Sequence, residues 1–540
     1  MIDKIRIQNL RALKDTDYID LKPLTILVGR NSSGKSTFLR FFPLMKQTLE
    51  TRTNEPILWY SPSYVDFGSF KESLNHESEN RTITFEFNLK VDKSFFSDEV
   101  SFYLNRQRFY RTAMPSTYIE NIVGEKTDEV DLNLKITFSK EKINKIEMQL
   151  WDHAIEILFP LEDTNKEMEF VEIIINGKLI KDVKLITKYL GNYSNMLPRI
   201  FTVEDEKITP SEIYFSNELF KIFKSYVPAN TKDSTIDEVI SSIELGNSNT
   251  ILQSLWDIKS SSKNITRNLA NYKLNHPKFI EIKNNYFGMI LNSFIDICNN
   301  ELSSFFSSVR YVAPIRASAE RYYRIQGLAL DEIDPQGTNI PMLLNNMSNK
   351  DKRNFNRWIK ENFHFEISAD STGGHTSLYI KYENGTKINL ADTGFGYSQI
   401  LPIILVMWQA VQTSENYARY KYKKMRIVDL EMFTIVIEQP ELHLHPSLQG
   451  VLIDTFAKII KVSKGIGIDL KIIIETHSET MINRVGQLIA TNFEGFNEDL
   501  VKVLMFNSSD PYNSNIKSTG YTDEGYLTSW PIGFFSPEEI

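Results

Sequence analysis

The stretch that decides the fold is Gly29-Arg30-Asn31-Ser32-Ser33-Gly34-Lys35-Ser36-Thr37, which fits the pattern G-x-x-x-x-G-K-[ST]. It follows a continuously apolar, β-branched run that predicts a buried strand, and a helix is expected to begin near Lys35. In this setting glycines let backbone N–H groups converge on phosphate oxygens, and the helix N-terminus adds positive potential. We therefore expect this loop to bind phosphate, with Lys35 neutralising the β- and γ-phosphates and Ser36 ligating Mg²⁺.

Length and composition indicate a large globular protein. The 540 residues are too many for one ordinary core of about 100–200 residues, so more than one lobe is expected. The longest apolar run, Ile400–Val411, is shorter than the roughly 20 residues that cross a bilayer, so no membrane span is expected. The single cysteine, Cys298, cannot form an intrachain disulfide, which favours a reducing, cytoplasmic setting. A net charge of −8 means that any nucleic-acid contact must be local.

The spacing of apolar residues divides the chain into three parts. Residues 1–200 are predicted to hold the strand–loop–helix and then a strand-rich lobe, because apolar residues alternate at period two. Residues 201–305 show apolar spacings of three and four with few Gly or Pro, which indicates a helical insertion. Residues 306–540 return to strands and helices. The first part is expected to contain a hairpin at Asn176-Gly177. The third part is expected to contain a hairpin at Asn384-Gly385, a buried helix at about Ser398–Gln412, and strands at Phe433–Ile437 and Lys471–Ile474.

Polar residues at two strand ends are candidates to complete the phosphate site. A phosphate-binding loop needs an acidic partner at the end of a neighbouring strand, and Glu438 ends the apolar run that starts at Phe433. Because a buried acid in that position is otherwise costly, we expect Glu438 to hold the hydration shell of the magnesium ion. His477 comes just after another buried strand, from where it can reach a γ-phosphate.

A second loop with glycines, Asp392–Gln399, opens the long apolar helix. Glycines at the start of a helix form an anion site, but one chain rarely needs two such sites for one nucleotide. We therefore expect Gly394, Gly396 and Ser398 to cap the γ-phosphate held by another copy, so that ATP joins two copies. The alternative interpretation is a tight turn into a core helix.

Together these motifs resemble the ATP-binding-cassette ATPase heads of the SMC, Rad50 and OLD-like group. GRNSSGKST is similar to Walker A, DTGFGYSQ to the signature loop, IVIEQPELHLHP to Walker B with its following loop, and ETHSE to the switch histidine. The resemblance implies an α/β fold, a P-loop ABC-type ATPase head with an antiparallel β subdomain and a helical insertion. It also implies ATP and Mg²⁺ as cofactors and a homodimer through the heads, or a higher oligomer. The implied roles are phosphate binding by Lys35, metal binding by Ser36 and Glu438, γ-phosphate binding by His477, and action across the dimer by Gly394, Gly396 and Ser398.

One position departs from the family pattern. The residue after the Walker B acid is usually the glutamate that activates water, and here it is Gln439. An amide cannot accept that proton, although it can orient water, as glutamine does in some GTPases. Glu441, two residues on, is an alternative base. The sequence therefore predicts slow hydrolysis and a long-lived ATP-bound closed state.

Three further runs are similar to the ATPase subunits of Septu antiviral defence systems, including retron-associated ones. They are EQPELHLHP, YVAPIRASAERYYRIQG and DEGYLTSWPIGFF. This resemblance implies an HNH endonuclease partner and, in the retron form, a reverse transcriptase with its RNA–DNA product. Because few residues follow His477 and they show no carboxylate cluster, the nuclease is expected on another chain. The alternative function is an SMC- or Rad50-like ATPase that clamps DNA in repair or chromosome maintenance.

Overall fold

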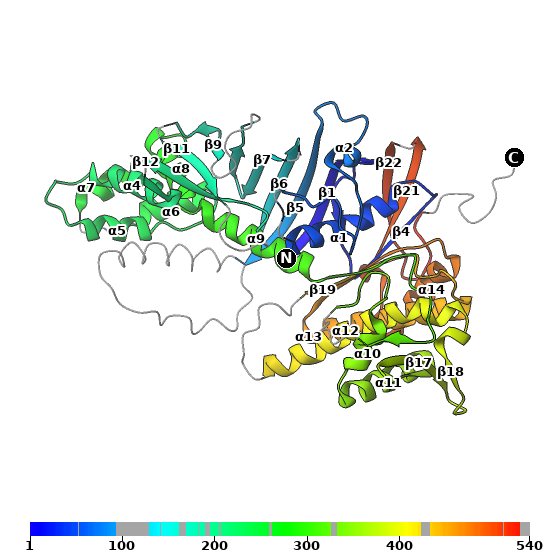
Figure 1. The fold of residues 1–540 in the computed structure, drawn as a ribbon. Coiled ribbons are helices and arrows are strands. Elements are labelled where there is room, and N and C mark those ends of the chain that lie inside the picture. Colours follow the sequence, from blue (N-terminus) through cyan, green and yellow to red (C-terminus); the bar gives the residue numbers. More distant parts are fainter. Residues whose placement is uncertain are drawn as a thin grey trace. The chain divides into compact units, whose positions relative to one another are not determined.

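The structure is a computed structural model of the chain, and the described part forms two compact units (Figure 1). The β-rich unit comprises Met1–Arg6 and Thr84–Ser303, and the P-loop unit comprises Ile7–Ile83 and Ser304–Ile540. The structure describes residues 1–51, 53, 55–92, 129–140, 142–160, 169–181, 183–188, 195–204, 207–258, 262–325, 332–422, 432–510 and 512–529.

A long antiparallel sheet dominates the β-rich unit, with strands in the order β13-β12-β11-β9-β8-β7-β6-β5. Alternate residues of β6 are buried, as the period-two pattern predicts. Asn176 and Gly177 have φ values of 50° and 76° and join β9 to β10, which confirms the predicted hairpin. The strand bounds are β5 (Thr82–Asp92), β6 (Glu129–Ser139), β7 (Lys142–Leu150), β8 (His153–Leu158), β9 (Glu169–Ile175), β10 (Lys178–Leu179), β11 (Lys184–Lys188), β12 (Arg199–Glu204) and β13 (Lys207–Pro210).

Helices follow this sheet along the chain, where apolar spacings of three and four predict them. Their buried residues lie on one stripe, for example Phe215, Leu219 and Ile222 of α4. The helix bounds are α4 (Ser211–Lys224), α5 (Asp233–Ser241), α6 (Ser248–Asp257), α7 (Lys263–Leu269), α8 (Pro277–Met289) and α9 (Leu291–Ser307).

The P-loop unit is built on a second sheet, in the order β14-β19-β20-β4-β21-β22. The first five strands are parallel and β22 is antiparallel to β21. Because parallel strands end at the same edge, the carboxyl edge of this sheet carries Gly29, Glu475 and Glu438 from three adjacent strands. The strand bounds are β4 (Leu24–Gly29), β14 (Val309–Val312), β19 (Met432–Glu438), β20 (Asp469–Glu475), β21 (Val501–Asp510) and β22 (Asn513–Thr519).

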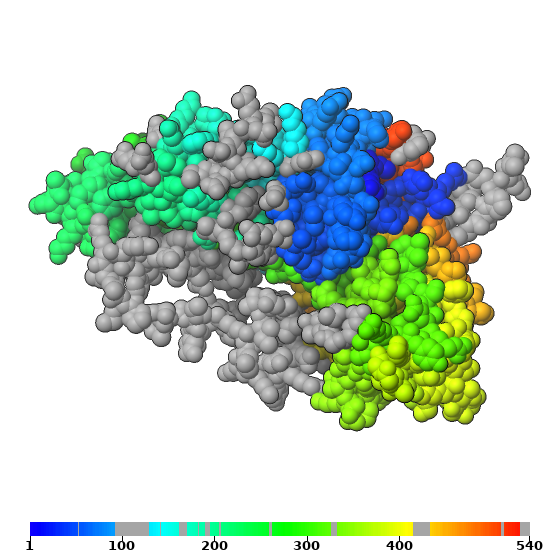
Figure 2. Space-filling view, in the orientation of Figure 1, coloured from blue at the N-terminus to red at the C-terminus, as the bar shows by residue number. Residues whose placement is uncertain are grey.

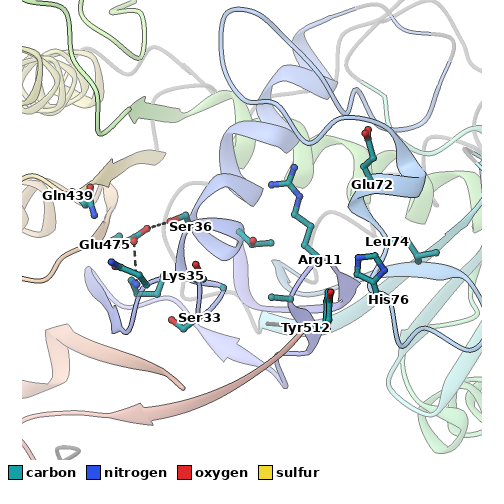
Figure 3. Close-up of a pocket in the computed structure, with 15 residues that line it drawn as sticks. Arg11, Ser33, Lys35, Ser36, Glu72, Leu74, His76, Gln439, Glu475 and Tyr512 are labelled. Atoms are coloured by element: carbon teal, nitrogen blue, oxygen red, sulfur yellow. Dashed lines mark hydrogen bonds and ion pairs between the residues drawn. The ribbon is translucent and has the colours of Figure 1, made fainter. Parts of the chain in front are cut away.

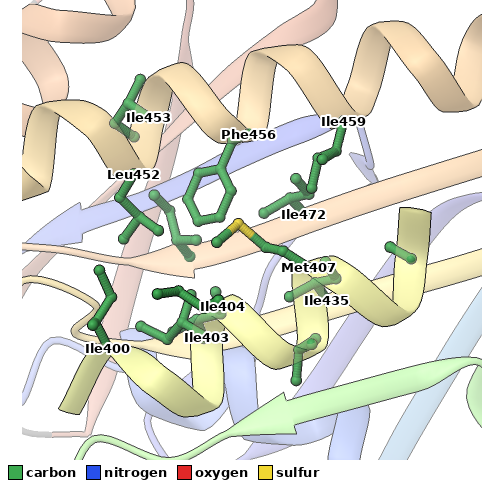
Figure 4. Close-up of a cluster of buried hydrophobic side chains, with 14 of the residues drawn as sticks. Ile400, Ile403, Ile404, Met407, Ile435, Leu452, Ile453, Phe456, Ile459 and Ile472 are labelled. Carbon is green, nitrogen blue, oxygen red and sulfur yellow. The ribbon is translucent and has the colours of Figure 1, made fainter. Parts of the chain in front are cut away.

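Helices α12 (Phe395–Tyr422) and α13 (Pro446–Ile466) pack on each other, and α12 packs on β19 (Figure 4). Met407 and Phe456 meet the strand residues Ile435 and Ile472 in the buried cluster. The predicted helix at Ser398–Gln412 is confirmed but is longer at both ends. The apolar pattern stops near Val411, yet the following residues include no Gly or Pro, so nothing in the backbone ends the helix there.

A small antiparallel sheet, β15-β17-β16 with β18 paired to β17, also lies in the P-loop unit. Figure 2 shows its neighbouring helices α10 and α11, in green to yellow-green, at the surface. The remaining bounds are β1 (Ile2–Leu10), β2 (Leu13–Asp15), β3 (Ile19–Asp20), α1 (Lys35–Glu50), α2 (Phe70–Ser73), β15 (Tyr323–Arg324), α10 (Ile340–Asn346), α11 (Asn349–Phe363), β16 (Phe365–Thr372), β17 (His375–Tyr382), β18 (Lys387–Asn389) and α14 (Glu479–Ala490).

The predicted α/β class, with an antiparallel β-rich part and a helical segment, is confirmed. The Asn384-Gly385 hairpin also forms, between β17 and β18. In the described part of the chain, no helix is both long enough and apolar enough to cross a membrane.

Candidate functional site

The phosphate-binding loop (Gly29–Thr37) joins β4 to α1, as the sequence predicts. A Cβ atom at Gly29 would lie 2.3 Å from the carbonyl oxygen of Phe506. Gly34 has a φ of 92°, and a Cβ atom there would lie 2.3 Å from Ser514 Oγ. Both glycines are therefore needed, because β21 and β22 approach the loop too closely for any side chain.

Lys35 is buried and folds back over the loop. Its Nζ donates hydrogen bonds to the carbonyl oxygens of Gly29 at 3.0 Å and Arg30 at 2.8 Å. It also lies 3.6 Å from Glu475 Oε1. Burial lowers the pKa of the Lys35 ammonium, while the Glu475 carboxylate opposes that shift. The cation that the motif requires is thus held at the loop by backbone oxygens and one carboxylate.

Glu475, the last residue of β20, lies beside the phosphate-binding loop (Figure 3). Its Oε2 accepts a hydrogen bond from Ser36 Oγ at 2.7 Å, and its Oε1 faces Lys35. Burial raises the pKa of Glu475, whereas the Ser36 hydrogen bond and the Lys35 charge lower it. The two side chains predicted to bind phosphate and metal therefore converge on a carboxylate that the sequence argument did not single out.

Glu438, the last residue of β19, has other partners. It accepts two hydrogen bonds from Arg40 of α1, from Nε at 2.6 Å and from Nη2 at 2.8 Å. The Tyr311 hydroxyl donates a third at 2.7 Å. With its side chain only 3% exposed, Glu438 belongs to a buried, bidentate ion pair. The structure brings Glu475 rather than Glu438 against Ser36, and metal binding by Glu438 stays a prediction.

Breaking the Arg40–Glu438 pair is expected to destabilise the protein. Arg40→Ala leaves Glu438 buried without its counter-ion, a change that costs about 3–5 kcal/mol when both partners are fully buried. The loss is smaller here because Arg40 is itself partly exposed. We expect the free energy of unfolding, measured by urea titration, to fall by about 2 kcal/mol.

Arg484→Ala provides the matched control. Arg484 makes the same bidentate contact with Asp454, at 2.6 and 2.9 Å, and its side chain is 35% exposed against 34% for Arg40. Asp454, however, is 23% exposed, so its loss of a partner is expected to cost at most about 1 kcal/mol. Equal losses in the two variants would contradict the importance of Glu438 burial.

Gln439 lines the cavity beside the phosphate-binding loop. Its N–H donates to the carbonyl oxygen of Glu475 at 2.9 Å, and its φ of 44° is in the left-handed region, which is strained for a residue with a side chain. Buried Arg316 donates to the carbonyl oxygens of Glu438 at 2.9 Å and Gln439 at 3.3 Å. These hydrogen bonds hold the strained backbone and place the amide at the cavity.

Glu441 and His477 are joined through the backbone. Glu441 Oε1 accepts from the His477 N–H at 2.7 Å, and Oε2 accepts from Thr476 Oγ at 2.9 Å. Both carboxylate oxygens are therefore engaged, and burial raises the pKa of Glu441. His477 Nε2 is buried with no hydrogen-bond partner in the described part of the chain. Burial and the nearby Lys35 charge lower the pKa of His477, which favours the neutral imidazole. His477 is not among the residues that line the cavity, and its contact with a γ-phosphate stays a prediction.

The cavity measures about 600 Å³, within the usual range for small-molecule sites. One end is formed by the phosphate-binding loop with Gln439 and Glu475. The other end contains His76 and Tyr512, whose rings lie 4.7 Å apart edge to face and offer aromatic surface to a nucleobase. The remaining lining residues are Arg11, Ala12, Glu72 and Leu74.

The groups present fit a triphosphate with a divalent metal. A lysine ammonium, a serine hydroxyl and a carboxylate meet at the loop, and close packing requires glycine at positions 29 and 34 of the loop. Ser33 Oγ, also in the loop, is buried without a hydrogen-bond partner among the described residues. Such an orphaned group at a phosphate site is explained by a ligand that completes it.

The signature loop (Asp392–Gln399) lies outside this cavity. A Cβ atom at Gly394 would have no atom within 4 Å, and Phe395 is 59% exposed. Gly396 approaches the His443 carbonyl, while Ser398 is buried and its hydroxyl donates to the Phe395 carbonyl oxygen at 2.9 Å. None of these loop residues lines the cavity of the same chain as far as the described residues show, and their action on a second copy stays a prediction.

Glu475 is the contact of Lys35 and Ser36 that sequence reasoning missed. The signal was available, because Glu475 ends an apolar strand in the same way as Glu438 and directly precedes Thr476-His477. A buried acid at a strand end is equally costly at both positions, so this cost alone does not distinguish Glu475 from Glu438. The strand order then decides between them, since β20 lies between β19 and β4.

The chain matches the family model described as AAA ATPase domain over residues 1–482. No curated protein matches it. The matched residues include the phosphate-binding loop, the signature loop and His477, and therefore every residue of the predicted site.

Among solved structures, the chain is similar to SMC head domains. One, from Pyrococcus furiosus, has an extended coiled coil and is bound to the C-terminal domain of ScpA; it is 11% identical, with 96% of each chain covered and a TM-score of 0.30. The SMC head domain from Thermotoga maritima is 10% identical, with 96% of this chain and 98% of that chain covered and a TM-score of 0.32. These low TM-scores carry no argument. The strand order establishes the fold, and the family match supports the ATPase activity.

Proposed function

Because the chain belongs to the AAA ATPase domain family and is an ATPase, we propose that it works as a slow, ATP-dependent switch whose copies close on bound nucleotide. Lys35 would bind the β- and γ-phosphates, Ser36 and a strand-end carboxylate would hold the metal, and His477 would contact the γ-phosphate. Bound Mg²⁺ would neutralise charge on the triphosphate.

The observation that carries the proposal of slow turnover is that neither residue predicted to act on the attacking water, Gln439 or Glu441, has a free carboxylate oxygen. Gln439 lines the cavity, but its amide cannot take a proton from water. Glu441 has both oxygens engaged by Thr476 and the His477 backbone. These residues can orient a water molecule, yet neither offers an unengaged carboxylate oxygen. We expect turnover below about 1 per second, at the low end for enzymes.

Closure of two copies is supported by the exposed signature loop, which starts the 28-residue helix α12. A helix N-terminus favours anions, and Gly394 leaves open space in front of it. The experiment is analytical ultracentrifugation with and without ATP and Mg²⁺, combined with a phosphate-release assay. Dimers that form with ATP and outlast many seconds are expected; a monomer in all conditions, or turnover at hundreds per second, would contradict the switch.

The wider role that we propose is control of a separate nuclease in an antiphage defence complex. Its support is the resemblance of EQPELHLHP and the two other quoted runs to Septu ATPase subunits. Parts of the two other runs lie outside the described residues. The partner would be an HNH endonuclease, with a reverse transcriptase and its RNA–DNA product in a retron form. Co-purification with the HNH protein of a neighbouring gene tests it, and a Lys35→Ala variant that protects cells fully would contradict it.

A second candidate function, direct DNA clamping, is favoured by α11. Its buried residues Phe355, Ile359 and Phe363 face the core, while basic residues three or four positions apart lie on the exposed side. Neither Lys350 nor Arg353 has an ion-pair partner among the described residues. The basic residues of this face are Lys350, Arg353, Arg357 and Lys360.

Duplex binding as a function of salt separates the two functions. A DNA clamp that uses this face should bind duplex with a steep salt dependence. Replacing Lys350, Arg353 and Arg357 with glutamine should then reduce the slope by about 2–3, because each lost phosphate contact contributes about 0.9. Absence of duplex binding by the wild-type protein would favour the nuclease regulator and exclude the clamp.

A further inference from the structure

Glu475 holds the two side chains that a metal-bound triphosphate needs. Its carboxylate accepts the Ser36 hydroxyl at 2.7 Å and lies 3.6 Å from the Lys35 ammonium, with its own side chain 4% exposed (Figure 3). Carboxylates commonly bind Mg²⁺ directly or through its water ligands, and the loop serine supplies a hydroxyl ligand. Position and chemistry both point to a metal site shared by Ser36 and Glu475.

The two neighbouring carboxylates accept hydrogen bonds from residues outside the phosphate-binding loop. Glu438 is held by Arg40 and Tyr311, and Glu441 by Thr476 and the His477 N–H. Glu475 is next to Glu438 across the parallel strands β19 and β20, but on the side of the phosphate-binding loop. Among these three carboxylates, Glu475 is the one that contacts the loop.

The charges of Lys35 and Glu475 favour a metal-bound triphosphate over a metal-free one. Lys35 and Glu475 neutralise each other, so a triphosphate that takes over Lys35 leaves the Glu475 charge beside its own negative oxygens. A divalent cation held by Glu475 and Ser36 would offset this repulsion. Metal-free triphosphate has no such compensation, and it must also separate Lys35 from its buried partner.

We propose that Glu475 forms the metal site with Ser36 and makes nucleotide binding depend on the metal, by repelling metal-free triphosphate. This inference rests on the proposed nucleotide site and adds to it the residue that couples the metal to the nucleotide. Glu438 keeps a separate task, which is to fix Arg40 and the end of β19.

Calorimetric titration with ATP, once with Mg²⁺ and once with EDTA, tests the proposal through binding and not through turnover. The coupling is the ratio of Kd in EDTA to Kd in Mg²⁺. In the wild-type protein Mg²⁺ should tighten binding strongly. In Glu475→Gln, which keeps the shape but removes the charge, Kd in EDTA should fall while Kd in Mg²⁺ should rise or stay constant. We expect the coupling to drop at least about tenfold.

Two further variants make the result specific. Asp469→Asn removes a carboxylate at the opposite end of β20 that does not line the cavity, so the coupling should stay within about twofold of wild type. Glu475→Asp keeps the charge and should retain most of the coupling even if it lowers stability. A Glu475→Gln protein with wild-type coupling would overturn the inference. A wild-type protein that binds no ATP in either condition would instead contradict the nucleotide site itself.

Discussion

Replacing Lys35 with alanine is expected to remove tight nucleotide binding. Lys35 is the buried cation of the loop, held by the Gly29 and Arg30 carbonyl oxygens and by Glu475. Its removal deprives the triphosphate of its counter-charge and leaves Glu475 unpaired in the cavity. Truncating one member of a buried charged contact costs about 2–5 kcal/mol, which is about 30-fold to several thousand-fold in Kd. Isothermal titration with ATP and Mg²⁺ measures this change.

Lys464→Ala is the control for Lys35→Ala. Lys464 is an exposed lysine in the last turn of α13, and it does not line the cavity. Its replacement should leave Kd within about twofold of the wild-type value. Wild-type affinity in Lys35→Ala would show that the phosphates bind somewhere other than at this loop.

The Gln439→Glu change is expected to speed ATP hydrolysis by at least about tenfold. A positioned general base typically contributes a factor of about 10²–10⁴, and the new carboxylate would take the place of an amide that already lines the cavity. The hydrogen bonds from Arg316 and to Glu475 involve the backbone of residue 439, so they do not depend on the side chain. Steady-state phosphate release at saturating ATP measures the effect.

Gln439→Ala separates water orientation from proton transfer. If the amide orients the attacking water, the alanine variant should turn over more slowly than the wild-type protein. A glutamate variant no faster than wild type would mean that Gln439 is not what limits hydrolysis. In that event Glu441, despite its two hydrogen bonds, becomes the better candidate for the base.

The phosphate-binding end of the site could be predicted because it depends on local sequence. Glycine spacing, Lys35 and Ser36 specify the loop within nine consecutive residues, and the apolar run before it specifies a parallel strand. The hairpins were predictable for the same reason, since Asn-Gly pairs adopt the positive φ values that the turns require.

The acidic partners could not be assigned from sequence, because the answer depends on strand order and on a distant arginine. Glu438 and Glu475 look alike in the sequence, since each ends an apolar strand. Only the order β19-β20-β4 places Glu475 nearer the loop. Arg40 then engages Glu438 across 398 residues of chain, a contact that no local pattern indicates. The extent of α12 was also underestimated, because its end is not marked by apolar spacing.

The central claim is that nucleotide held by Gly29–Thr37 of one copy is sealed by the signature loop of a second copy, and mixing two inactive variants tests it directly. Lys35→Ala keeps an intact signature loop, and Gly394→Glu keeps an intact phosphate-binding loop but places a carboxylate near the γ-phosphate. The two variants are mixed without nucleotide, and ATP hydrolysis is then measured after Mg²⁺ and ATP are added. The claim predicts that each variant alone is inactive and that the mixture recovers activity, because the mixed dimer contains one complete site. A mixture as inactive as its components, or a fully active Gly394→Glu protein, would contradict it.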